Sequence, residues 1–304
     1  MAKRTLLTST QMATFAARGF LRFDGVVPAA LNEAFLAPLE RADDDGGSLM
    51  ARYGRLMGTK ALPAIDSGTR WRRAFPKDSV IGALLRLPVL RGAIDSLVGR
   101  KAVVDHHFMH LRPPPADGET PQAQHYHQDS TIDTRRAFDI QLFYFPHAIT
   151  GDMGGTRFLP GSHLRQVSES AITRYQNIRG QERVQCAAGT VLILHHGIWH
   201  GGGANASDRS RFLWKLRLCP QQPQQRLWNL SDLPADHLRQ RPTFWIDPSA
   251  PVDPVHRILT TPEPWFEADT ARLEYIARVR LWRYLLGDER FDADYWVTRI
   301  ENDY

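Results

Sequence analysis

The chain has 304 residues, of which 42% are hydrophobic and 23% are charged, an ordinary globular composition that allows a sizeable buried core. Its formal net charge of +5 arises from 38 basic and 33 acidic residues, and this mild excess does not indicate a nucleic-acid partner. No stretch of ~18 consecutive apolar residues occurs, so the sequence predicts no transmembrane helix and no membrane partner. The two cysteines exclude a disulfide framework and a cysteine-rich metal site, and they favour a cytoplasmic location.

The N-terminal segment is predicted to form a helix rather than a targeting peptide. Thr8 and Gln11 are spaced as a capping box at its start, and Gly19 suits the left-handed residue that ends it. Residues 20–23 are predicted to form a short strand. A second helix is expected from Pro28, because proline is tolerated at the first helical position.

Residues 48–80 have no clear hydrophobic period and are expected to be mostly loop. A further helical stretch over residues 79–97 is predicted to be interrupted at Pro88. These segments together make up a predicted helical cover over residues 1–98.

A β-rich core is predicted over residues 99–220. In the first strand, residues 100–111, alternation places four residues on one face: Val104, His106, Phe108 and His110. Further strands, separated by glycine and proline, are predicted over residues 139–145, 189–194 and 211–218. Short strands separated by glycine and proline predict a barrel or a double-sheet β fold.

The C-terminal part is predicted to wrap around this core. Residues 221–264 are rich in Gln and Pro and weakly patterned, so an extended course is expected. Residues 265–286 are predicted to form a helix whose apolar stripe either packs on the core or serves as a lid or dimer face. The whole chain, residues 1–304, is expected to be a single domain.

Two histidines and a carboxylate are spaced to bind one metal ion. His127 and Asp129 form a His-X-Asp triplet at the end of a strand-like segment, where residues i and i+2 share a face. His200 lies far downstream, after a buried strand. Two histidines and one carboxylate bind Fe(II) as a facial triad that leaves other metal positions open. The triplet alone is a weak motif, and a surface pair is the alternative interpretation of it.

Arg211 begins the strand that follows His200. A 2-oxo acid bound to the metal would explain it, because the far carboxylate of that cosubstrate needs a bidentate, always-charged donor. With these residues in order, the chain resembles the phytanoyl-CoA dioxygenase family of iron and 2-oxoglutarate oxygenases over about residues 5–220. The resemblance is carried by residues 19–21, 108–114, 127–129 and 154–163, and by His200, Asn205 and Arg211.

The family implies a mainly β fold with flanking helices, in which a double-stranded β-helix, or jelly roll, forms the core. It implies that Fe(II) is bound by His127, Asp129 and His200, that 2-oxoglutarate is bound by Arg211, and that O2 is the oxidant. Four further positions fall near the family's cosubstrate contacts: Arg70, Phe108, Arg112 and Phe145.

Other histidines leave alternatives open. His195 and His196 are rivals of His200 as the distal ligand. A zinc site of His196 and His200 at helical spacing conflicts with the neighbouring glycines and the missing glutamate. His125 is expected behind the metal ligands or facing the substrate, and His163 is expected to order its own turn.

The resemblance implies a dioxygenase that hydroxylates, desaturates or cyclises an unactivated C–H bond of a small-molecule metabolite and releases succinate and CO2. Asp129 disfavours a halogenase, whose iron usually lacks that carboxylate. The alternatives are a non-catalytic jelly roll that binds a small ligand and retains a metal site, and a zinc or manganese hydrolase in which Arg211 has no role. A basic cluster is either a solvated loop or a clamp for an anionic group of the substrate: Arg70, Arg72 and Arg73. Either a monomer or a dimer is expected.

Overall fold

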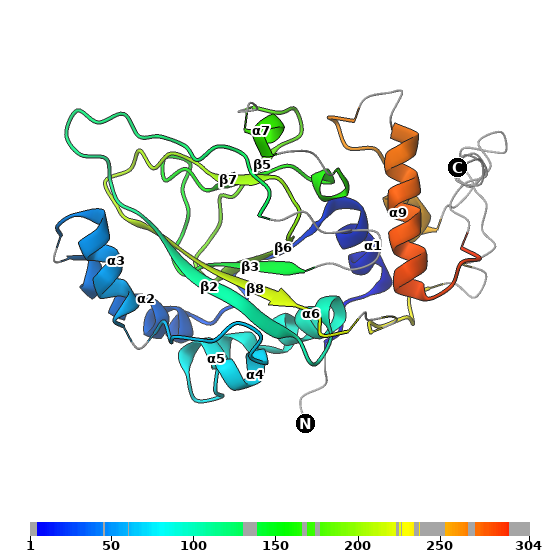
Figure 1. Cartoon of the computed structure of the whole chain (residues 1–304), viewed down its shortest axis with the longest axis horizontal. Coiled ribbons are helices and arrows are strands. Elements are labelled where there is room, and N and C mark those ends of the chain that lie inside the picture. Colours follow the sequence, from blue (N-terminus) through cyan, green and yellow to red (C-terminus); the bar gives the residue numbers. More distant parts are fainter. Residues whose placement is uncertain are drawn as a thin grey trace.

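Two antiparallel sheets form the centre of the molecule in the computed structural model, and helices flank them (Figure 1). The structure describes residues 5–44, 46–59, 61–129, 139–165, 169–173, 177–222, 225, 227–233, 237, 253–266 and 271–291.

The larger sheet contains β1 (Phe20–Phe23), β2 (Val103–Arg112), β3 (Ile140–Phe145), β6 (Thr190–His195) and β8 (Arg211–Cys219). The smaller sheet contains β4 (Thr156–Phe158), β5 (Glu182–Arg183) and β7 (His200–Gly202). The strand orders are β1-β6-β3-β8-β2 and β5-β4-β7, and all neighbours run antiparallel. The predicted jelly roll with flanking helices is therefore confirmed.

The larger sheet is covered on both faces, because alternate side chains point to opposite sides. Phe143, Leu192 and Leu213 belong to an inner core that also contains Phe158 of the smaller sheet. Trp214 and its alternating neighbours belong to an outer core that they share with the helices. The inner face of this sheet is therefore the one that meets the smaller sheet.

A register shift in β2 changes which of its residues share a face. The shift lies between Val104 and His106 in the pairing with β8, and an extra residue reverses the alternation. Val104 is buried in the outer core with Met109, whereas His106 is exposed. The predicted common face is therefore wrong at Val104. Beyond the shift it holds, and His110 lines the cavity described below.

Helix α1 (Ser9–Arg18) starts and ends where the sequence predicts. The Thr8 hydroxyl accepts a hydrogen bond from the backbone N–H of Gln11 at 3.2 Å. The Gln11 side chain accepts in return from the backbone N–H of Thr8 at 3.0 Å, which completes the capping box. Gly19 ends the helix in the left-handed conformation, with φ of 76°.

His163 attaches α1 to the loop after β4. Its Nε2 lies 3.0 Å from the carbonyl oxygen of Ala16, and a Cβ added at Gly19 would lie 2.5 Å from its Nδ1. Burial lowers the pKa of His163 to about 3, so the imidazole is neutral at physiological pH. The expectation that this histidine orders its own turn is wrong, because its ring contacts α1 instead.

Five helices follow in the N-terminal cover: α2 (Ala29–Asp44), α3 (Leu49–Met57), α4 (Trp71–Ala74), α5 (Val80–Leu85) and α6 (Pro88–Val98). The predicted break at Pro88 is confirmed, since α6 begins there. The predicted loop over residues 48–80 is wrong at α3 and α4. Ser48 caps α3, and Arg52 of α3 pairs with Asp43 of α2, a contact that local periodicity does not reveal.

The C-terminal part contributes α8 (Pro254–Thr260) and α9 (Ala271–Leu286), and the short α7 (Glu169–Ile172) precedes β5. Helix α9 lies beside α1 and α8 and buries Leu281, Trp282 and Leu285 (Figure 1). The extended course expected for residues 221–264 is wrong at α8, and much of that stretch lies outside the described residues. In the part of the chain that the structure describes, no helix has the length and apolar character needed to cross a membrane.

Replacing Gly19 by Ala is predicted to lower the free energy of unfolding by about 3 kcal/mol, because a left-handed backbone and the nearby His163 ring both oppose a side chain. Equilibrium urea denaturation measures the loss. Gly25→Ala is the matched control, since Gly25 also has a positive φ, 56°, but nothing lies within 4 Å of its added Cβ. The control is expected to lose only about 1 kcal/mol. Equal losses would contradict a tight contact between His163 and α1.

Candidate active site

The two histidines of the predicted triad are held together by their backbones. The N–H of His127 donates to the carbonyl of His200 at 3.0 Å, and the N–H of His200 donates to the carbonyl of His127 at 3.1 Å. Residues that exchange both bonds across an antiparallel pair direct their side chains to the same face. Their ring centroids lie 4.4 Å apart.

Two backbone carbonyls orient these imidazole rings. Nδ1 of His127 lies 3.1 Å from the carbonyl oxygen of His125, and Nδ1 of His200 lies 3.1 Å from that of Ile198. With the proton on Nδ1, each Nε2 keeps its lone pair, which is the tautomer that metal-binding histidines need.

The Asp129 carboxylate completes the group. Its Oδ1 lies 3.5 Å from Nε2 of His127, and its Oδ2 lies 3.6 Å from Nε2 of His200. The three possible ligand atoms lie within 4.8 Å of one another. The donor set therefore fits an ion that takes two imidazoles and one carboxylate.

The charge states of the triad are set by burial and by close contacts. Burial alone would raise the pKa of Asp129, but the hydrogen bond with His127 and the charges of His200 and Lys215 hold it well below its usual range. Burial lowers the pKa of His200 to about 3. Burial alone would also lower the pKa of His127, but the contact with Asp129 and the carbonyl of His125 outweigh it and raise that pKa.

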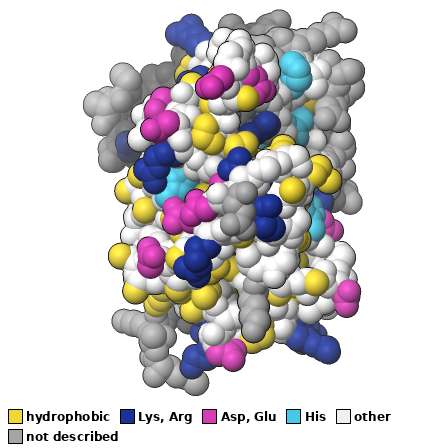
Figure 2. Space-filling view, turned by 90° about the vertical axis from the view of Figure 1, so that its left-hand side faces the viewer, with side chains coloured by type: hydrophobic (Ala, Val, Ile, Leu, Met, Phe, Trp, Pro, Cys, Tyr) yellow, Lys and Arg dark blue, Asp and Glu magenta, His cyan; other side chains and the backbone are white. Residues whose placement is uncertain are grey.

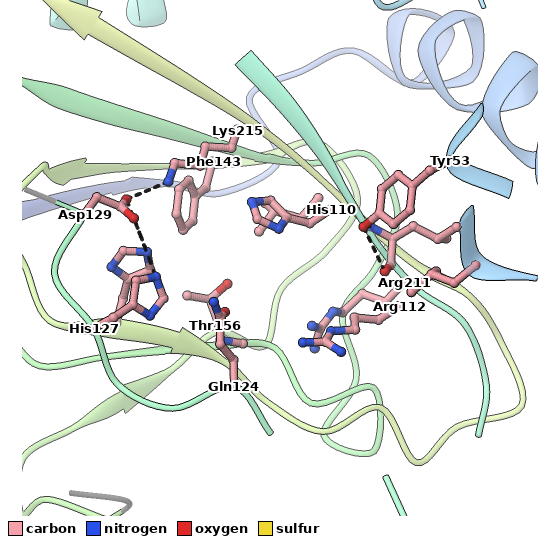
Figure 3. A pocket seen from close by; sticks show the side chains of 15 residues that line it. Tyr53, His110, Arg112, Gln124, His127, Asp129, Phe143, Thr156, Arg211 and Lys215 are labelled. Carbon is pink, nitrogen blue, oxygen red and sulfur yellow. Dashed lines mark hydrogen bonds and ion pairs between the residues drawn. The ribbon is translucent and has the colours of Figure 1, made fainter. Parts of the chain in front are cut away.

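A cavity of about 380 Å³ opens beside the triad, near the lower end of the roughly 300–1,000 Å³ typical of small-molecule sites. It contains His127, Asp129, His200, Arg112 and Arg211 from the sequence prediction. Figure 3 shows Asp129 between Lys215 and His127, with the guanidinium groups of Arg211 and Arg112 together across the cavity.

Sequence reasoning missed ten further lining residues: Leu49, Tyr53, His110, Leu111, Gln124, Phe143, Thr156, Gly202, Leu213 and Lys215. Three of them had a usable signal, because alternation along β2 and β8 places them on the same face as Arg112 or Arg211: His110, Leu213 and Lys215. Burial lowers the pKa of His110 to about 4, so this histidine is neutral in the cavity.

Helix α3 contributes to the cavity and to the surface around it. Leu49 and Tyr53 line the cavity, and Leu49 and Met50 remain exposed at 44% and 80%. Apolar and charged side chains are mixed over the left-hand face of the molecule, the side on which Figure 1 places α3 (Figure 2). The cavity thus combines a polar end at the triad with an apolar edge at α3.

Arg211 is a buried cation whose guanidinium is held by backbone carbonyls. Nη1 donates to Met153 at 2.8 Å, to Gly203 at 3.1 Å and also to Gly154. Burial, and then the charge of Arg112, lower the pKa of Arg211 to about 10, which still leaves it charged at physiological pH. None of the carboxylates that the structure describes forms an ion pair with it. A buried charge without a counter-ion is unfavourable, so this end of the cavity suits an anionic ligand group.

The other predicted cosubstrate residues are not all brought to the cavity. Arg112 lines it, but Phe108 is 40% exposed and its ring packs on Tyr53, with the ring centroids 5.8 Å apart. Phe145 is buried in the inner core and does not line the cavity. Arg70 is exposed at the start of α4, also outside the cavity.

The basic cluster near residue 70 has a structural role at Arg72. Its guanidinium lies 3.1 Å from the buried Asp95 carboxylate and 5.1 Å from the ring of Trp71. This cluster does not line the cavity, so it does not support an anionic ligand there. The cations that do line the cavity are Arg112, Arg211 and Lys215.

The rival histidines lie outside the cavity. His195 is buried beside Phe15 and His163, and its Nδ1 accepts a hydrogen bond from the backbone N–H of Gly197 at 2.9 Å. His196 is buried and His125 is exposed, and neither side chain lines the cavity. Among the three candidates for the distal ligand, only His200 is placed beside Asp129.

A second group of potential ligands, His237, Asp253 and His256, is buried near α9. Nδ1 of His237 lies 2.9 Å from Oδ2 of Asp253, and its Nε2 accepts from the indole N–H of Trp282 at 3.3 Å. Oδ1 of Asp253 accepts from the N–H of Val255 and caps α8. The polar atoms of His237 and Asp253 are therefore used in protein hydrogen bonds, which is typical of a structural network.

Comparisons with known proteins identify the family of this chain and proteins with a similar fold. The sequence profile of the phytanoyl-CoA dioxygenase (PhyH) family matches residues 15–213. The structure of HygX from Streptomyces hygroscopicus with nickel and 2-oxoglutarate bound has a TM-score of 0.51 and 17% identity, over 71% of this chain and 88% of HygX. This similarity supports the jelly-roll fold.

Two uncharacterized proteins, from Mycobacterium bovis and Mycobacterium tuberculosis, are each 26% identical to this chain over 130 residues. The aligned part covers 42% of this chain and 46% of each relative. The chain thus spans about half the length of the curated relatives it matches.

His200→Ala is predicted to lower the affinity for Co(II) roughly 100-fold, because it removes a proposed metal ligand. The substitution keeps both backbone hydrogen bonds to His127, so the local backbone is expected to stay in place. Isothermal titration calorimetry measures the affinity. His237→Gln is the control from the second buried group and is expected to leave Co(II) binding unchanged. If only the His237 variant lost Co(II) binding, the metal would be bound by the second group and not by His127, Asp129 and His200.

Proposed function

The chain belongs to the phytanoyl-CoA dioxygenase family, and on that premise we propose that it is an Fe(II)- and 2-oxoglutarate-dependent dioxygenase. It hydroxylates, or desaturates or cyclises, an unactivated C–H bond of a small-molecule metabolite, and it releases succinate and CO2. The observation that carries this proposal is that the His127, Asp129 and His200 group and the buried Arg211 line one cavity.

His127, Asp129 and His200 would hold Fe(II), which together with 2-oxoglutarate and O2 supplies the oxidising chemistry. The chain's own task is to orient the metal ligands and to exclude water from the site. The carbonyls of His125 and Ile198 fix the imidazole tautomers, and the burial of His200 limits access of bulk water to its side of the site. HygX has a similar fold and was crystallised with nickel and 2-oxoglutarate bound, which supports a site for a metal and 2-oxoglutarate here.

Arg211 would bind the distal carboxylate of 2-oxoglutarate, since guanidinium matches a carboxylate with two parallel hydrogen bonds. Gly202 leaves room for this, because a Cβ added there would lie 3.2 Å from Nη2 of Arg211. Arg112 lies beside Arg211 and is a second cation for the same group. Cosubstrate contacts at Arg70, Phe108 and Phe145 gain no support from the cavity lining.

The substrate is proposed to be a small and acidic molecule. Two cations that line the cavity, Arg112 and Arg211, have no carboxylate partner among the described residues, whereas Lys215 is paired with Asp129. A positive cavity raises the local concentration of anions and their rate of entry. The alternative of a non-catalytic binding protein is disfavoured by the complete triad and by Arg211.

A single domain over residues 1–304 and a cytoplasmic location complete the proposal. One hydrophobic cluster contains residues of the N-terminal cover, the larger sheet and α9, which supports one domain. Cys186 and Cys219 are free thiols, which agrees with a reducing compartment. A monomer and a dimer both remain compatible with this assignment.

His127→Ala and Asp129→Ala are predicted to abolish substrate-dependent succinate formation, because each removes a proposed metal ligand. A library of acidic metabolites is first screened for 2-oxoglutarate consumption by the wild-type protein, and succinate is then quantified by mass spectrometry. His125→Ala is the control, because it keeps the backbone carbonyl that orients His127. Wild-type turnover in either ligand variant would refute the assignment.

Arg211→Gln is predicted to raise the KM for 2-oxoglutarate by roughly 100-fold, as expected when a buried charge pair loses one partner. Steady-state kinetics at saturating substrate measure the change. Arg70→Gln removes an exposed arginine outside the cavity and is expected to leave this KM unchanged. A larger effect at position 70 than at 211 would reverse the proposed cosubstrate assignment.

A further inference from the structure

Strand β8 places three cations on its inner face, and each has a different partner. Arg211 donates to backbone carbonyls, whereas Arg217 donates to Asp139 at 2.7 Å. Lys215 lies between them, and its Nζ is 2.6 Å from Oδ2 of Asp129. Positions 211, 215 and 217 share one face because side chains alternate along a strand. Only Lys215 contacts the triad directly.

The surroundings of Lys215 hold its ammonium in place. Its side chain is 9% exposed and lies opposite Phe143 of β3 and Phe108 of β2. Nζ is 5.9 Å from the ring centroid of Phe143. A charge-assisted hydrogen bond of this length in a buried site is among the stronger polar contacts in proteins. Figure 3 shows the ammonium next to the Asp129 carboxylate, with Arg211 further away across the cavity.

We infer that Lys215 is a positioning residue for the metal, an inference that rests on the proposed function. Its ammonium binds Oδ2 of Asp129 and leaves Oδ1 as the single oxygen offered to the ion. Aspartate can bind a metal through one oxygen or through both. Binding through both would fill a position that 2-oxoglutarate or O2 requires, since the facial triad works by leaving positions open.

The same contact argues against a direct substrate role for Lys215. Its charge is balanced by Asp129 at 2.6 Å, whereas Arg112 makes no hydrogen bond or ion pair through its guanidinium with any residue that the structure describes. Arg112 and Arg211 are therefore the lining cations that have no carboxylate partner among the described residues, and Lys215 acts through Asp129.

The test uses Lys215→Met, which keeps the length of the side chain and removes the ammonium. The variant is loaded with Co(II), whose visible absorption reports its coordination. We expect an altered spectrum before any 2-oxoglutarate is added, because Asp129 then binds through both oxygens. Titration with 2-oxoglutarate is expected to show an affinity about 10- to 100-fold weaker than in the wild type.

A second test variant and two controls are measured alongside Lys215→Met. Lys215→Arg keeps the positive charge and is expected to restore the wild-type spectrum. Lys215→Gln removes the charge and is measured alongside, so the result does not depend on the folding of one variant. Arg217→Met removes the next cation of the strand, which is paired with Asp139 and lies outside the cavity, and is expected to leave spectrum and affinity unchanged.

An unchanged spectrum in Lys215→Met and Lys215→Gln overturns the inference, even if 2-oxoglutarate binds more weakly, because simple charge attraction would explain that loss. An equal change in Arg217→Met also overturns it. If the wild-type Co(II) spectrum does not respond to 2-oxoglutarate, the proposed function itself fails. If the wild-type spectrum responds to 2-oxoglutarate but the Lys215 variants have the wild-type spectrum, the inference fails and the proposed function stands.

Discussion

The site depends on two backbone hydrogen bonds, of 3.0 and 3.1 Å, between His127 and His200. They join a loop residue before β3 to the first residue of β7, two segments far apart in the chain. Because backbone atoms make these bonds, the two imidazoles meet whatever their charge state. The carbonyls of His125 and Ile198 then set the tautomers, and Asp129 follows from its place two residues after His127. The geometry of the proposed metal site thus depends on backbone pairing.

The charged side chains that line the cavity are paired with an opposite charge at one end and have no such partner among the described residues at the other. Lys215 and Asp129 neutralise each other beside the proposed metal position. Arg211 is buried without a described carboxylate, and its like-charged neighbour Arg112 lowers its pKa further. A protein maintains such a pair at a cost in stability unless a ligand supplies the opposite charge. The cavity end formed by β2 and β8 is therefore suited to the anionic ligand proposed above.

The helices hold the sheets in the arrangement that this cavity needs. The outer core ties α1 and α9 to the larger sheet, and the inner core joins the two sheets. His163 connects the loop after β4 to α1 through Ala16, and Gly19 makes that close approach sterically possible. The neutral, buried histidines His163 and His195 lie outside the site and pack against each other and against α1.

The sequence alone determined the features that depend on local spacing: the capping box at Thr8, the break at Pro88, the strands of the larger sheet, and the His-X-Asp triplet with its distal His200 and Arg211. Only the tertiary structure decided what depends on contacts between distant residues. The register shift after Val104, the helix at residues 49–57 and the use of His163 on α1 all arise from pairing or packing that no local pattern encodes. Lys215 illustrates the limit: alternation places it on the inner face, but only the folded chain brings its ammonium to Asp129.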